Sequence, residues 1–79
     1  MNVVGKEDGF NVASGIAFTK EGFGVTDQEN SRVLIYDLNG ELLQVISDNI
    51  NYPTDVLFDE NQLYITNFKE NSITLYTLN

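Results

Sequence analysis

The chain has 79 residues, which is enough for one small domain, and its 42% hydrophobic and 20% charged content is typical of a globular protein. Twelve acidic against four basic residues give a formal charge of -8, which argues against nucleic acid or an anionic membrane surface as a partner. Cysteine and histidine are absent, which excludes disulfides, thiolate or imidazole metal ligands, and Cys or His catalysis.

The predicted elements are short β-strands. Residues 1–7 lack the basic start and long apolar stretch of a signal peptide, and no apolar run approaches the about 18 residues of a membrane span. We therefore expect a soluble protein without an export signal of its own, in a compartment that the sequence leaves open. Strand signals with a period near two follow, and no helix is expected; they cover residues 15–19, 23–27, 32–38, 41–47, 55–58, 62–66 and 72–78.

Turn-forming residues separate these strands. Asn39-Gly40 is the strongest hairpin signal, because both residues tolerate the positive φ of a type I′ turn. The other turns are rich in Glu, Asn, Asp, Ser and Gly, as expected between short antiparallel strands.

The sequence repeats itself with a period of 40 residues. Residues 1–39 align with residues 41–79 without a gap, and polar turns stay opposite polar turns. Seven of the 39 pairs are identical: Asp8/Asp48, Asn11/Asn51, Phe18/Phe58, Thr26/Thr66, Tyr36/Tyr76, Leu38/Leu78 and Asn39/Asn79. Four strands in about 40 residues are the dimensions of one β-propeller blade. We therefore predict an all-β fold in which residues 1–79 form a single module of two four-stranded blades.

Three segments of the second unit resemble the NHL repeat, whose usual pattern runs P-x-(D/G)-(V/I)-A-V-D, (I/L)-Y-V-(A/T)-D and N-x-R-(V/I). They are PTDVLFD (53–59), QLYITN (62–67) and NSI (71–73), and the first unit matches in SGIAF (14–18), GVTD (24–27) and NSRV (30–33). The departures are Ala13 for Pro, Asn67 for Asp and Ser72 for Arg. The resemblance covers nearly the whole chain and implies a six-bladed propeller. Gluconolactonase-like and strictosidine-synthase-like propellers share a similar pattern.

The two units are circularly offset. Residues 41–47 are the outer fourth strand of the first unit and residues 1–7 are their counterpart, whereas the second unit has no fourth strand of its own. Because propellers have 4 to 8 blades, two cannot close a ring. We expect a homo-oligomer, and the six-bladed resemblance favours a homotrimer in which residues 1–7 of one protomer complete a neighbour's blade. The alternative is an engineered chain or a fragment of a longer propeller.

Candidate ligand-binding residues lie in loops that a propeller places at one mouth of its channel. These loops span residues 7–14, 27–31, 47–54 and 67–71, and the candidates are Asp8, Asp48, Asn11, Asn51 and Asp55. Such oxygens suit a hard cation such as Ca²⁺, or a polyol. No cofactor is required, and no metal site or catalytic residue is identified. The competing interpretation is that these side chains cap their own turns, which the recurrence of Asp8/Asp48 and Asp27/Asn67 favours.

Two charged residues need a separate account. Asp55 replaces Gly15 at the start of an inner strand, where copies in a ring would approach the axis and repel one another unless a cation or shared protons intervened. The alternative for Asp55 is a hydrogen bond to the neighbouring backbone. Arg32, the only arginine, is expected to pair with Asp27 or Glu29 in a local ion pair of little energetic weight.

The function that we expect is that of a non-catalytic propeller scaffold or binding module, which self-assembles and holds a small ligand, ion or peptide at its acidic mouth. NHL-like domains are mostly interaction platforms, so this expectation rests on the resemblance. The alternatives are a metal-dependent lactonase-like hydrolase, whose asymmetric metal site fits poorly with three identical copies, and an engineered or fragment propeller without a ligand. No Gly-rich phosphate loop or nucleophile elbow is present.

Overall fold

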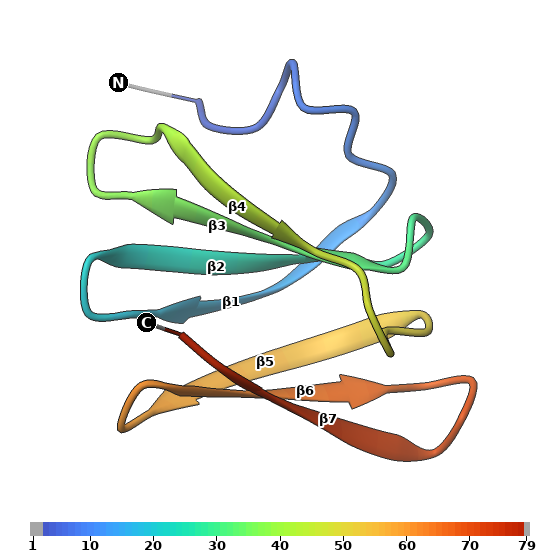
Figure 1. Cartoon of the computed structure of the whole chain (residues 1–79). Coiled ribbons are helices and arrows are strands. Elements are labelled where there is room, and N and C mark those ends of the chain that lie inside the picture. Colours follow the sequence, from blue (N-terminus) through green and yellow to red (C-terminus); the bar gives the residue numbers. More distant parts are fainter. Residues whose placement is uncertain (1–2, 79) are drawn as a thin grey trace.

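The chain folds into strands and turns. The computed structural model describes residues 3–78 and arranges seven strands in two antiparallel sheets (Figure 1). The four-stranded sheet has the order β1 (Ala13–Phe18), β2 (Gly22–Asp27), β3 (Arg32–Asp37) and β4 (Leu42–Ile46). The three-stranded sheet has the order β5 (Pro53–Asp59), β6 (Gln62–Asn67) and β7 (Ser72–Thr77). The all-β prediction is confirmed, and none of residues 3–78 belongs to a helix that could cross a membrane.

The hairpin predicted at Asn39-Gly40 is present, but its type differs. Gly40 has a φ of 85°, whereas Asn39 does not have a positive φ. The amide of Gly40 donates to the carbonyl of Asp37, and the amide of Asp37 donates to the carbonyl of Glu41, both at 3.0 Å. The loop is therefore a type I turn followed by a glycine bulge. The Asp37 carboxylate stabilises it by accepting the amides of Asn39 and Glu41, each at 2.9 Å.

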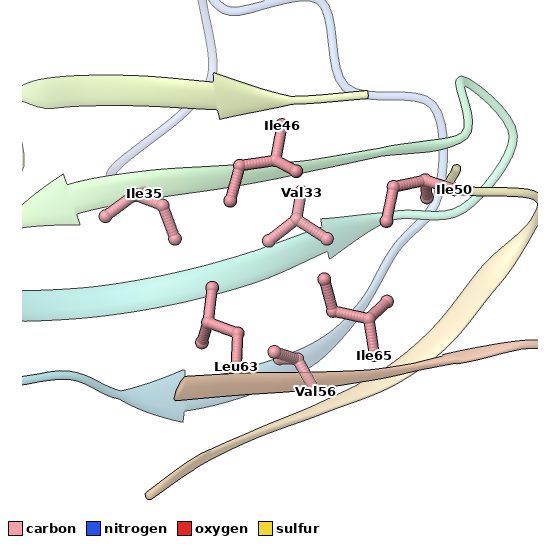
Figure 2. Packing of buried hydrophobic residues seen from close by; sticks show 7 residues of the cluster. All are labelled: Val33, Ile35, Ile46, Ile50, Val56, Leu63 and Ile65. Atoms are coloured by element: carbon pink, nitrogen blue, oxygen red, sulfur yellow. The ribbon is translucent and has the colours of Figure 1, made fainter. Parts of the chain in front are cut away.

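The hydrophobic core lies between the two sheets. Strand alternation turns every second side chain of each sheet toward the other, and these side chains point at one another in Figure 2. The cluster consists of Val33, Ile35, Ile46, Ile50, Val56, Leu63 and Ile65. We call the face of the four-stranded sheet that carries Val33 and Ile35 its contact face. Burial of this apolar surface, at about 25 cal/mol per Å², is what holds the sheets together.

Positions 40 residues apart make the same local contacts. The amides of Gln28 and Phe68 donate to the carbonyls of Val12 and Tyr52, at 2.9 and 3.1 Å. Val12 and Tyr52 share a positive φ, of 70° and 53°. The strands that follow them, β1 and β5, each contain an irregularity of register near their first residues. The two sheets are therefore entered by loops of the same shape.

Residues 3–12 form no strand and lie against the far face of the four-stranded sheet, opposite the contact face (blue in Figure 1). A Cβ atom on Gly5 would lie 3.1 Å from Tyr36 Oη, and one on Gly40 would lie 2.9 Å from a methyl group of Val4. Tyr36 is only 1% exposed beneath this segment. Residues 1–2 of the predicted fourth strand, and residue 79, lie outside the described residues. A partner strand for residues 3–7 stays a prediction.

Candidate functional site

The loops predicted to share one mouth lie at the same end of the two sheets. Figure 1 shows the entries to β1 and β5 and the turns after β2 and β6 together on the right. Hydrogen bonds join these loops: the Asn11 amide donates to Asp27 at 2.7 Å, and the Tyr52 amide donates to Ser31 Oγ at 3.0 Å. The second bond connects the two sheets, because Ser31 follows β2 and Tyr52 precedes β5.

Asp27 is the centre of the hydrogen-bond network at this end. Its carboxylate is fully buried and accepts the Asn11 amide at 2.7 Å, Asn30 Nδ2 at 2.9 Å and Arg32 Nε at 2.7 Å. Arg32 also donates through Nη2 to the carbonyl of Asp8 at 2.6 Å. The expected pairing of Arg32 with Asp27 is confirmed. The Asp27 carboxylate is buried, however, and a buried carboxylate depends on its cation far more than an exposed one does, so we expect the pair to have more energetic weight than the sequence suggested.

The three-stranded sheet replaces this ion pair with a neutral amide. Asn67 Oδ1 accepts the Asn51 amide at 2.9 Å, as Asp27 does for Asn11 in the other sheet. Asn67 Nδ2 donates to Thr74 Oγ1 at 2.7 Å. Both residues therefore cap the loop that enters their sheet, which agrees with the structural role expected for this pair.

The candidate ligand residues in the entry loops are partly engaged in contacts within the chain. Asp8 Oδ2 accepts a hydrogen bond from Tyr36 Oη at 2.8 Å. Asn11 and Asn51 contribute their backbone amides to the two caps. Asp48 is exposed in the loop after β4. The contacts of Asp8 are therefore not repeated at Asp48. The hydroxyl of Tyr76, which is the counterpart of Tyr36, instead accepts a hydrogen bond from Gln44.

Asp55 lies where β1 and β5 run close together. A Cβ atom on Gly15 would lie 3.0 Å from Asp55 Cα and 3.1 Å from its Oδ1, so glycine leaves the room that Asp55 needs. The Asp55 carboxylate accepts the amide of Val56 at 2.9 Å, the backbone bond that we considered as its alternative role, while the residue stays exposed. Among residues 3–78, no cluster of three acidic side chains has a metal-binding arrangement, and Ca²⁺ stays a prediction.

Two tyrosines make polar contacts that the sequence did not predict. Tyr52 Oη donates to Glu29 Oε2 at 2.6 Å, which raises the pKa of Tyr52 and adds a second link between the sheets. Tyr36, which the repeat pairs with Tyr76, is buried, and its hydroxyl donates to the Asp8 carboxylate at 2.8 Å. The available signal was the choice of Tyr rather than Phe at a buried repeat position, because a buried hydroxyl needs a partner.

The buried hydroxyl of Tyr36 predicts a loss of stability at alkaline pH. Burial, and then the hydrogen bond to Asp8, raise the pKa of Tyr36 well above its ordinary value. The stabilising effect is present below about pH 10, where unfolded tyrosine is neutral, and is lost as the pH rises toward the folded pKa. Urea unfolding across this range should show a smaller alkaline loss in Tyr36→Phe than in the wild type. Tyr64→Phe is the control, and equal losses in all three proteins would contradict the assignment.

The arrangement at this end is suited to holding loops in place: the buried carboxylate of Asp27 and the amide of Asn67 each satisfy a backbone amide and brace a turn. At the other end, a groove of about 600 Å³ opens between the sheets, beside residues such as Phe58, Gln44 and Leu78. A scan against protein-family models finds no match for the chain, and a search of curated proteins finds none.

Proposed function

We propose that the chain is a non-catalytic β-propeller module of the NHL type, in which each sheet is a blade, and that it assembles with copies of itself into a closed ring that serves as a scaffold. The observation that carries the proposal is that equivalent faces of the two sheets differ in burial. The contact face of the four-stranded sheet is buried, whereas the equivalent face of the three-stranded sheet is exposed.

The exposed face of the three-stranded sheet, which we call the outer face, carries the counterparts of core residues. Val33 and Ile35 are 0% and 4% exposed between the sheets, but their counterparts Ile73 and Leu75 are 62% and 57% exposed. Leu57 on β5 adds a third exposed side chain. Apolar side chains grouped in this way mark an interaction site, because leaving them in water is unfavourable. A second sheet, packed on the outer face as the three-stranded sheet packs on the contact face, would cover them.

The far face of the four-stranded sheet offers the complementary surface. In the three-stranded sheet, Val56 and Phe58 pack against the contact face, and Val56 is buried there. Their counterparts Ile16 and Phe18 are 61% and 75% exposed. Each chain therefore has two exposed apolar surfaces that match each other: the outer face, and the β1 part of the far face, which residues 3–12 leave uncovered. A second copy can supply what the first one lacks, and six blades at two per chain correspond to a trimer.

In such a ring, the acidic loops would surround one mouth, and Asp55 of every copy would approach the axis. A small cation, Ca²⁺ included, or a peptide is the ligand that this mouth would take. The bonds that Asp8, Asn11 and Asn51 make within the chain favour the scaffold over the ligand as the main role of these loops.

Light scattering after size exclusion tests the proposal. The wild-type mass should be about three times the 8.9 kDa of one chain. Leu75→Asp places a charge on the outer face and should reduce the mass to that of a single chain, because burying an unpaired charge is unfavourable. Phe68→Asp, at a turn residue that is 65% exposed and belongs to neither sheet face, is the matched control and should leave the mass unchanged. A wild-type mass of one chain at every concentration would overturn the proposal.

A further inference from the structure

The geometry points to the free edge of β7 as a strand acceptor, whose occupant is residues 3–7 of a second copy. This inference rests on the proposed function and specifies how the copies are joined and in which register. Among residues 3–78, strand β7 pairs only with β6, so its second edge presents amides and carbonyls that no described strand pairs with. The corresponding strand of the other sheet, β3, has both edges paired, with β2 and β4.

A shallow groove of about 570 Å³ follows this free edge. One wall is β7 itself, and the other is formed by the loop that enters the three-stranded sheet. The residues that the argument uses are Ser72, Ile73, Thr74 and Leu75 on the strand, and Asn49 and Glu70 beside it. Thr74 Oγ1 fixes the loop to the strand by donating to the carbonyl of Asn49 at 2.5 Å. The groove thus runs along an unpaired sheet edge, and such an edge can accept an added strand from another chain.

Residues 3–5 already lie where the fourth strand of a preceding sheet would lie. Strand β4 reaches the sheet that follows it through Gln44, whose Nε2 donates to Tyr76 Oη at 2.6 Å. The counterpart of Gln44 is Val4, and the counterpart of Tyr76 is Tyr36. Gly5, next to Val4, lies against Tyr36, since its Cβ position is 3.1 Å from the hydroxyl. Residues 3–5 therefore have the same neighbour as β4 does, without a sheet to join.

Contacts of Asp8 hold this position, and the Asp8 amide also donates to the carbonyl of Gly5 at 3.0 Å. Tyr36 Oη binds the Asp8 carboxylate, and Arg32 binds the Asp8 carbonyl at 2.6 Å. The segment before Asp8 is thereby presented at the far face of the four-stranded sheet. When a second copy places its outer face there, its open β7 edge meets residues 3–7.

The pairing of β3 with β4 sets the register of the added strand. Val33 pairs with Ile46, and shifting both by the repeat period places Lys6 opposite Ile73. Val4 then lies opposite Leu75, on the same side of the sheet as Lys6.

Disulfide trapping tests the register, because the chain contains no cysteine of its own. In Lys6→Cys/Ile73→Cys, directly opposed residues of two copies have Cβ atoms close enough for a disulfide. Mild oxidation should convert most of the protein into covalent oligomers on a denaturing gel. Lys6→Cys/Leu57→Cys is the matched control, since Leu57 belongs to β5 at the opposite edge of the sheet, and it should remain a single-chain band.

Light scattering on the same reduced samples separates the two proposals. A trimeric mass with trapping in the Ile73 pair supports both. A trimeric mass with no trapping, or with equal trapping in the Leu57 pair, overturns the strand acceptor and leaves the ring. A single-chain mass overturns both. Val4→Cys/Leu75→Cys is a second pair in the same register, so a defect confined to one variant does not decide the result.

Discussion

Arg32→Ser should lower the free energy of unfolding by about 3 kcal/mol, because it leaves the buried Asp27 carboxylate without its cation. Asp27 is fully buried, and Arg32 Nε lies 2.7 Å from Oδ2. Urea unfolding measures the change. Asp27→Ala should be similarly harmful, since the Asn11 amide would lose its acceptor.

The other sheet supplies the control for this experiment. There, Asn67 and Ser72 stand at the positions of Asp27 and Arg32, and Asn67 accepts the same kind of amide. The double variant Asp27→Asn/Arg32→Ser should therefore recover most of the stability that Arg32→Ser loses. A double variant as unstable as the single one would show that Arg32 acts through its contact with the Asp8 carbonyl instead.

Leu63→Ala should reduce the free energy of unfolding by about 3 kcal/mol, the usual effect of a cavity in a core. Leu63 is 0% exposed and packs between the sheets, so the cavity weakens the only core cluster described for residues 3–78. For a chain of this size, that loss is a large fraction of the total, about 4 to 12 kcal/mol. Thermal and urea unfolding followed by circular dichroism measure it.

Two milder variants calibrate the Leu63 result. Ile65→Val, in the same cluster, should have an effect of about 1 kcal/mol. Leu38→Ala, at an exposed turn, should stay within about 0.5 kcal/mol. If Leu63→Ala splits unfolding into two transitions, the sheets are separate folding units, contrary to the single core described here.

The strands were predictable because the information that specifies them is local. Alternation with a period of two and turn residues at each end place every strand, since each depends on a few neighbouring residues. The turn at Asn39-Gly40 was predicted in place but not in type. Its type depends on the Asp37 carboxylate, which binds the two amides across the turn.

The site was only partly predictable, for a related reason. The entry loops were placed at one end by the repeat, yet the atoms that they use depend on packing. Asn11 and Asn51 act through backbone amides rather than through the side chains that made them candidates. Asp27 is buried because the loop before β1 folds over it, and a local sequence pattern cannot predict a contact between distant segments.

The close approach of Gly15 to Asp55 has a consequence for how many copies an assembly contains. It fixes how near β1 and β5 come to each other, and in the proposed ring this would set the angle between successive sheets. In the proposed ring, the contact between copies joins two unlike faces and is therefore heterologous. The copies close only if the angle between successive sheets divides a full turn. A side chain at position 15 would push β5 away from β1, so in the proposed ring it would change the number of copies or leave the assembly open as a filament.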